Sequence, residues 1–87
     1  MNILRVPVNK AVDTAADLLK KNNIQNPRLE ARLLVASATE LSDSAIISSP
    51  EYLVDVKEND QISEVISRRC GGEPLAYILG EKEFWSL

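Results

Sequence analysis

The side chains that most often perform catalysis are scarce in this chain. Its 87 residues include no histidine, the commonest general base and a frequent metal ligand, and one cysteine, Cys70. The neighbouring Arg69 would favour the Cys70 thiolate, but a thiol without a histidine is a poor nucleophile. We expect Cys70 to be a small apolar residue at a helix end. The carboxylates are scattered over the expected helix surfaces, so we predict no catalytic residue and no metal site.

Four arginines are the candidates for binding a partner. Arg28 and Arg32 are four positions apart, which places them on one face at the start of an expected helix. Arg68 and Arg69 lie in the last turn of a later expected helix, where the helix dipole favours cations. Plain solvation is the alternative explanation for both pairs. The second pair could also contact whatever follows it in the chain.

The chain closes with the run RRCGGEPLAYILGEKEFWSL, which alternates helix breakers with a short apolar stretch. The Gly71-Gly72 pair predicts a helix end, because glycine takes the left-handed conformation without a steric penalty. It is not a dinucleotide-binding loop, since no strand is expected before it and no spaced third glycine follows. Pro74 suits a first helical turn. We therefore expect a short helix that Gly80 ends, and then an extended segment over residues 81–87.

Phe84 and Trp85 form a large aromatic pair close to Leu87. One interpretation is that this segment folds back and buries Trp85 in the core. The other is that Leu87 is an artificial end, and that the pair begins a strand leading into a missing domain and docks against it.

Hydrophobic periodicity predicts the upstream elements. Apolar residues recur at three- and four-residue steps over residues 8–19, which indicates a helix that begins at Pro7 or Asn9. Asn22 and Asn23 follow it and can form a left-handed exit.

The Asn26-Pro27 pair predicts the start of a second helix, with Asn26 capping free amides and Pro27 in the first turn. This helix is apolar on most sides over residues 29–39, so we expect it to be the central one. Within it, Leu33→Asp is expected to be the most damaging change.

Short capping signals mark two further helices. Ser42 precedes a brief apolar run and is the expected cap of a third helix. Asp55 and Glu58 have the spacing of a capping box at the start of a fourth. Glu64 and Arg68 are spaced for an ion pair on its outer face.

The composition fits a single small all-α domain, a five-helix bundle. The chain is 45% hydrophobic with few aromatic residues, and no strand is indicated before residue 81. A net charge of −3 argues against nucleic acid as a direct partner. One cysteine, no signal peptide and no long apolar run predict a cytoplasmic protein without membrane contact. We expect a monomer.

The closing run resembles the junction segment of the release factor glutamine methyltransferases, the HemK/PrmC group. In that family the run R-R-x-x-G-E-P, followed by a short apolar stretch, a glycine and E-F-(W or Y), closes an N-terminal helical domain. The matching residues are Arg68, Arg69, Gly72, Glu73, Pro74, Ala76, Gly80, Glu83, Phe84 and Trp85. The upstream run NPRLEARLLVA also matches, so the resemblance covers essentially the whole chain, most weakly at residues 1–8 and 48–60.

The resemblance implies that residues 1–80 are a substrate-recognition domain and that residues 81–87 begin a linker to a missing methyltransferase domain. That domain would hold S-adenosylmethionine with an Asn-Pro-Pro-Tyr motif and a glycine-rich loop. Neither motif occurs here, so we assign no cofactor-binding residue to this chain. The implied protein substrate is a peptide chain release factor, methylated on the glutamine side-chain amide of its Gly-Gly-Gln motif.

Two other functions are compatible with the residues alone. A free-standing helical interaction module without an enzyme would show the same periodicity. A helix-turn-helix nucleic-acid binder could be built from residues 26–49, although the acidic balance weighs against it. The open reading frame beyond Leu87 would separate the first of these from the methyltransferase interpretation.

Overall fold

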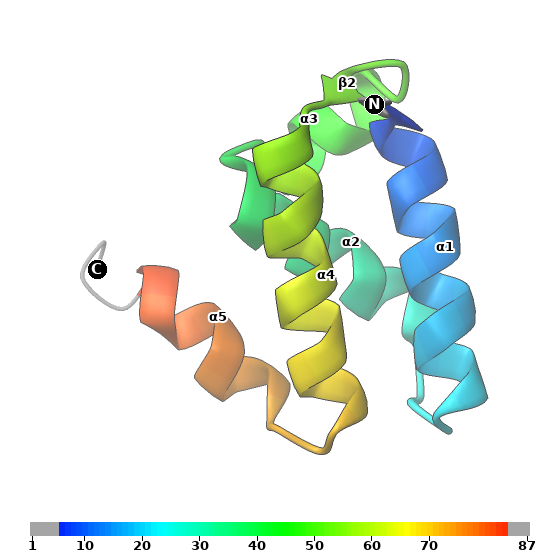
Figure 1. Ribbon diagram of the computed structural model, residues 1–87, viewed down its shortest axis with the longest axis vertical. Coiled ribbons are helices and arrows are strands. Elements are labelled where there is room, and N and C mark those ends of the chain that lie inside the picture. The colour runs from blue at the N-terminus through cyan, green and yellow to red at the C-terminus, as the bar shows by residue number, and fades with distance from the viewer. Residues whose placement is uncertain (1–5, 84–87) are drawn as a thin grey trace.

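A helix over Pro27–Thr39, α2, lies at the centre of the fold and contacts four other helices (Figure 1). The computed structural model describes residues 6–83 of the chain. In order, the elements are β1 (Val6–Pro7), α1 (Val8–Lys21), α2, α3 (Asp43–Ser48), β2 (Leu53–Val54), α4 (Val56–Cys70) and α5 (Leu75–Glu83). The predicted all-α bundle with a central second helix is confirmed.

The helices enclose one apolar core to which every helix contributes. In Figure 1, α1 and α4 run alongside each other in the same direction and α2 crosses behind them. The largest fully buried side chains are Val8, Leu19, Leu34, Val35 and Val54. Within the described part of the chain, no helix has the length and apolar character needed to cross a membrane.

The buried face of α2 includes Leu34 rather than Leu33, the residue singled out from the sequence. Leu34 is 0% exposed, whereas Leu33 is only partly buried and Leu29 is 45% exposed. On burial, Leu34 rather than Leu33 is the position of α2 where a charge should now be most damaging. A helix that is apolar on most sides does not itself define which side faces the core.

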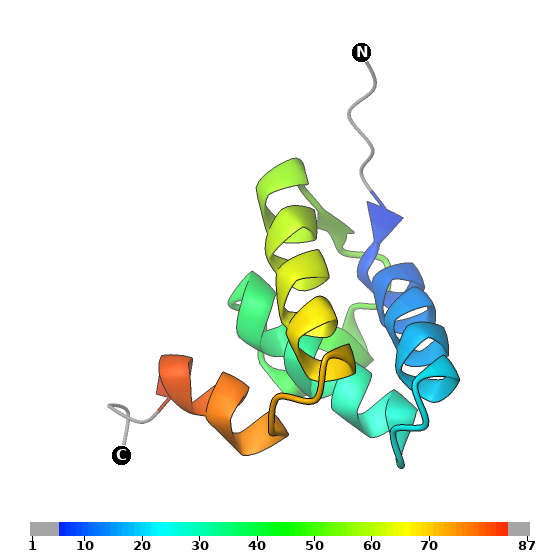
Figure 2. The same ribbon diagram turned by 60° about the horizontal axis from the view of Figure 1, so that its bottom comes forward.

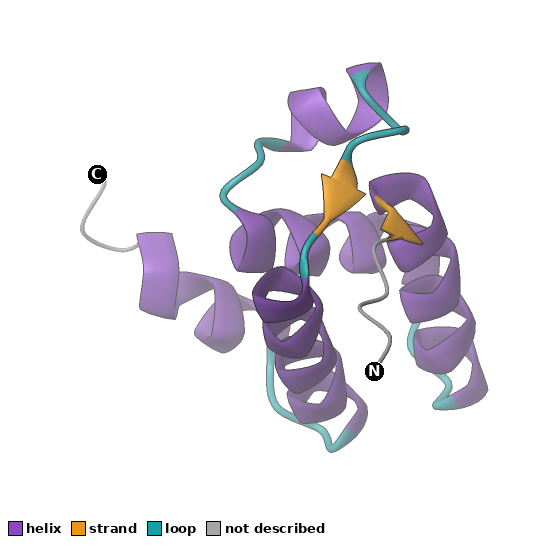
Figure 3. Cartoon of the chain, turned by 45° about the horizontal axis from the view of Figure 1, so that its top comes forward, coloured by secondary structure: helices purple, strands orange, loops and turns teal. Residues whose placement is uncertain are grey.

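A two-stranded antiparallel sheet at the start of α1 was not predicted (Figure 3). Its register pairs Val6 with Val54 and Pro7 with Leu53. The Val8 amide donates to the Tyr52 carbonyl at 2.6 Å, and the Asn9 amide donates to the Pro50 carbonyl at 3.1 Å. These carbonyls satisfy the free first amides of α1, which has no side-chain cap. The strands are too short for their alternation to be visible in the sequence.

The predicted caps of α3 and α4 are confirmed. The Ala45 amide donates to the Ser42 hydroxyl oxygen at 3.0 Å. Asp55 and Glu58 form a reciprocal capping box, in which each backbone amide donates to the other side chain, at 2.8 and 3.0 Å.

Asn26 stands at the expected position before α2 but does not cap it with its side chain. Its φ of 53° is left-handed, and a side-chain cap needs an extended backbone to reach the second or third amide. The Glu30 amide instead donates to the Asn26 carbonyl at 3.0 Å, and Pro27 occupies the first turn as predicted.

The exit of α1 has the predicted left-handed residue. Asn23 has a φ of 64°, and its amide donates to the Lys20 carbonyl at 3.0 Å. The Ile24 amide donates to the Leu19 carbonyl at 3.0 Å, and the Ile24 side chain packs against the core. These bonds form a Schellman motif that satisfies the last carbonyls of the helix.

The end of α5 differs from the prediction. The helix continues through Gly80 to Glu83, so residues 81–83 are helical rather than extended. A glycine weakens a helix but ends it only where the backbone turns left-handed, and Gly80 does not do so. Phe84 and Trp85 lie outside the described residues.

Candidate functional site

The part of the chain that the structure describes contains no group of side chains placed to hold a metal ion. Within residues 6–83, no three His, Cys, Asp or Glu side chains are grouped so that they could hold a metal ion. Cys70 lies partly buried at the end of α4, with its Sγ 3.9 Å from the Leu18 carbonyl oxygen. It occupies the helix-end position that the sequence indicated.

The first two candidate arginines, both on α2, form ion pairs with different neighbouring helices. Arg28 Nη2 lies 2.7 Å from Asp13 Oδ1 of α1. The Arg28 side chain is 64% exposed and the Asp13 side chain 51%. The Arg32 Nε donates to Asp43 Oδ1 of α3 at 2.5 Å, and the Arg32 side chain is 27% exposed. Arg28 therefore keeps most of its surface available to a partner, whereas Arg32 mainly connects α2 to α3.

The second pair lies at the turn between α4 and α5. Arg68 binds the Glu73 carboxylate with two nitrogens, its Nε donating at 3.0 Å and its Nη2 also donating. Arg69 reaches Glu30 on α2, with Nε donating to Oε1 at 2.7 Å and Nη2 to Oε2 at 3.4 Å. A third nitrogen of Arg69, Nη1, donates to the Glu73 carbonyl at 3.0 Å. These arginines thus form ion pairs within the domain.

The sequence did not reveal Glu73 and Glu30 as the carboxylates that bind Arg68 and Arg69. Glu73 could have been found, since it follows Arg68 by five positions across a glycine pair that bends the chain. Glu30 could not, because 39 positions separate it from Arg69. Likewise, Arg68 pairs with Glu73 across the turn, a contact that the helical spacing of Glu64 and Arg68 did not suggest.

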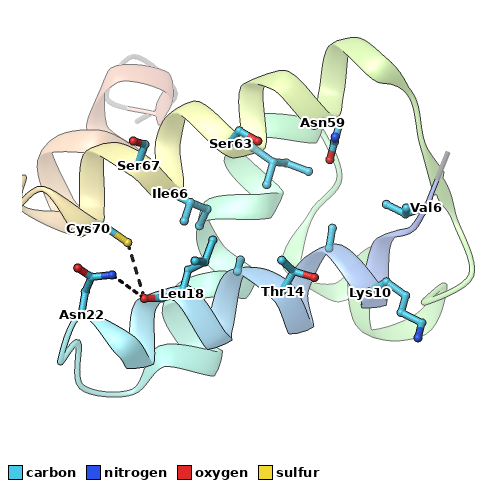
Figure 4. Close-up of a pocket in the computed structure, with 13 residues that line it drawn as sticks. Val6, Lys10, Thr14, Leu18, Asn22, Asn59, Ser63, Ile66, Ser67 and Cys70 are labelled. Atoms are coloured by element: carbon cyan, nitrogen blue, oxygen red, sulfur yellow. Dashed lines mark hydrogen bonds between the residues drawn. The ribbon is translucent and has the colours of Figure 1, made fainter. Parts of the chain in front are cut away.

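A groove of about 530 Å³ lies between α1 and α4 (Figure 4). It is lined by Val6, Lys10, Ala11, Thr14, Ala15, Leu18, Asn22, Asn59, Ile62, Ser63, Ile66, Ser67 and Cys70. Among the described residues that line it, Lys10 is the one with a charge. At one end, Asn22 Nδ2 donates to the Leu18 carbonyl at 2.8 Å (Figure 4). The lining thus combines apolar side chains with uncharged polar ones and a single lysine.

Hydrogen bonds to carboxylates shift two pKa values within the described residues. The Tyr52 hydroxyl donates to Glu58 Oε2 at 3.1 Å, and this bond raises the pKa of Tyr52 above its usual 10.0. The bond from Arg69 to Glu30 likewise raises the pKa of Arg69. Both groups therefore keep their protons at neutral pH and donate hydrogen bonds rather than acting as bases.

The fold and the paired arginines define a small all-helical domain with an ion-paired turn before its last helix. The profile of the PrmC N-terminal domain family matches residues 10–80, and the chain belongs to this family. The resemblance inferred from the sequence is therefore confirmed.

Several named relatives agree with this membership. The chain is 44% identical over 72 residues to the release factor glutamine methyltransferase of Haemophilus influenzae, covering 83% of this chain and 25% of that protein. It is 44% identical over 68 residues to the protein of the same name from Buchnera aphidicola subsp. Acyrthosiphon pisum, covering 78% of this chain and 24% of that protein. A bifunctional methyltransferase of Rickettsia bellii is 35% identical over 83 residues, covering 95% of this chain and 15% of that protein. The chain thus spans about a quarter of the length of the first two relatives. No solved structure matches it.

Proposed function

We propose that this chain is the substrate-recognition domain of a larger, S-adenosylmethionine-dependent methyltransferase. The proposed enzyme methylates the glutamine side-chain amide in the Gly-Gly-Gln motif of a peptide chain release factor. The observation that carries the proposal is the family match over residues 10–80. Two relatives that share this part of their sequence are release factor glutamine methyltransferases, which supports the proposal.

The residues of this chain do not fit a methyl-donor loop. Its glycine pair, Gly71-Gly72, closes the C-terminal end of α4, where backbone carbonyls rather than amides point outward. A donor with a carboxylate group needs amides or cations to hold it. We therefore derive no step of the methyl transfer from these residues and assign the donor to the remainder of the proposed enzyme.

A separate recognition domain has a physical purpose in such an enzyme. A side-chain amide is a weak nucleophile, and a Gly-Gly-Gln loop presents little surface. Contacts remote from the reacting atom supply binding energy and orientation without taking part in the chemistry. A tethered domain also raises the effective concentration of the substrate beside the active site.

Among the four candidate arginines, Arg28 is the best placed to contact the release factor. Its side chain is 64% exposed, against 27%, 26% and 20% for Arg32, Arg68 and Arg69. An exposed charge at an interface acts mainly through the rate of association and through specificity. On α5, Tyr77 is 67% exposed, and we propose that it joins Phe84 and Trp85 in docking this domain onto the methyltransferase domain.

The Arg28→Glu variant of the full-length protein tests the proposed function. We expect it to weaken release factor binding by about fivefold to tenfold, mainly through slower association, while the affinity for S-adenosylmethionine stays unchanged. Surface plasmon resonance measures the first quantity and calorimetry the second.

Asp13→Asn is the matched control, because it removes the ion-pair partner of Arg28 and keeps the arginine. It should leave factor binding unchanged or tighter. An equal loss in both variants would show that the ion pair to α1, rather than a contact with the factor, is responsible.

A further inference from the structure

The turn between α4 and α5 is closed by backbone hydrogen bonds around Gly72. The Gly72 amide donates to the Arg69 carbonyl and the Glu73 amide to the Arg68 carbonyl, at 3.0 and 3.1 Å, which completes a Schellman motif. Gly72 has a φ of 105°, and no atom lies within 4 Å of the position that a Cβ would occupy there. The Schellman bonds hold residues 68–73, whereas α5 begins after them at Leu75, so contacts beyond this motif place α5 against the bundle.

Apolar packing attaches α5 at few points. Ile78 is its one buried side chain among residues 75–80, at 2% exposure, with Leu75 and Leu79 partly buried. Tyr77 points outward, at 67% exposure. Figure 2 shows α5 beside α4 on the side of the bundle away from α1, so α5 has neighbours on one side.

Four charged side chains connect this turn to the central helix. We name Glu30, Arg68, Arg69 and Glu73 the junction clamp. Arg69 bonds both α2, through Glu30, and the turn, through the Glu73 carbonyl, while Arg68 holds the Glu73 carboxylate. The Arg69 and Glu30 side chains are 20% and 14% exposed, so water screens this pair less than the exposed Arg28–Asp13 pair.

We infer that the junction clamp sets the direction in which α5 leaves the bundle. Its members come from α2, from the last turn of α4 and from the loop before α5, so it ties three segments at one point. The planar fork of Arg69 orients as well as attracts, because it engages Glu30 with two nitrogens and the Glu73 carbonyl with the third. The clamp acts together with the apolar packing of Ile78 to place α5. In the full-length protein the clamp would also orient a catalytic domain, and this part of the inference rests on the proposed function.

Hydrogen exchange of the 87-residue chain tests the clamp. In Glu30→Gln, the protection of the Ile78 and Leu79 amides should fall about tenfold, while that of the Leu19 amide in α1 stays unchanged. Arg69→Lys keeps the charge but loses the fork, so it should show the same local pattern with a smaller loss, and it provides a second variant should Glu30→Gln not fold. Asp13→Asn breaks an exposed ion pair elsewhere and should leave α5 protection unchanged.

Two results would overturn the inference. Unchanged α5 protection in both clamp variants would show that Ile78 packing alone holds the helix. An equal loss at Ile78 and Leu19 would show that the clamp supports the whole fold rather than the direction of α5. Neither readout requires a donor or a release factor, so they decide on the clamp independently of the proposed function.

A last experiment measures catalysis by the full-length protein. Glu30→Gln should lower kcat/KM for the intact release factor about tenfold and leave donor affinity unchanged, because a misdirected α5 misplaces the recognition domain. Full activity together with lost α5 protection would overturn the catalytic consequence and leave the clamp itself standing.

Discussion

Replacing Leu34 with aspartate is expected to unfold the domain. Leu34 is 0% exposed on α2, the helix that contacts α1, α3, α4 and α5. Losing its side chain leaves a cavity, and the buried carboxylate has no partner, so the cost should be about 5 kcal/mol or more. The whole stability of a chain of this length is roughly 4 to 13 kcal/mol. Urea unfolding followed by circular dichroism should show an absent or strongly lowered transition.

The same helix provides graded controls. Leu29→Asp places the charge at a side chain that is 45% exposed and should change the free energy of unfolding by less than about 1 kcal/mol. Leu33→Asp, at a partly buried position, should fall between the two. An effect at Leu33 equal to that at Leu34 would show that α2 is rotated differently from the helix described here.

Removing residues 1–80 from the full-length protein should reduce kcat/KM for an intact release factor at least about a hundredfold, because the tether and the remote contacts are lost together. For a short peptide that carries Gly-Gly-Gln, kcat/KM should change less than about threefold, since such a peptide has no remote contacts to lose. Methyl incorporation from labelled donor measures both.

Donor affinity of the truncated protein is the control for that experiment, because it reports whether the remaining domain is folded. If donor affinity is retained and both substrates lose activity equally, residues 1–80 support the active site rather than recognising the factor. If neither substrate loses activity, the recognition role is wrong.

The sequence determined the helix boundaries that depend on short local signals. Ser42, the pair Asp55 and Glu58, and the glycine pair before Glu73 each act within one turn of the chain, so their chemistry is visible without the fold. The central position of α2 also followed from its apolar residues. Gly80 shows the limit of such signals, since a glycine ends a helix only where the surrounding structure requires a left-handed backbone.

The contacts that the sequence did not reveal join distant segments. Glu30 and Arg69 meet because α2 and α4 pack together, and no helical spacing relates them. The carbonyls of Pro50 and Tyr52 complete α1 only because a two-residue strand pairs with β1. For the candidate site, the residue types were found from the sequence. Only the structure separated an exposed arginine, Arg28, from arginines that bind within the domain.

The central claim is that this domain recognises the release factor and leaves the methyl donor to the rest of the protein. Amide chemical shifts of the isotopically labelled chain, recorded while either ligand is added, test it most directly. We expect saturable shifts on adding the release factor, including the Arg28 end of α2, and no shifts on adding S-adenosylmethionine. Saturation by S-adenosylmethionine at micromolar concentration, with no response to the factor, would contradict the account.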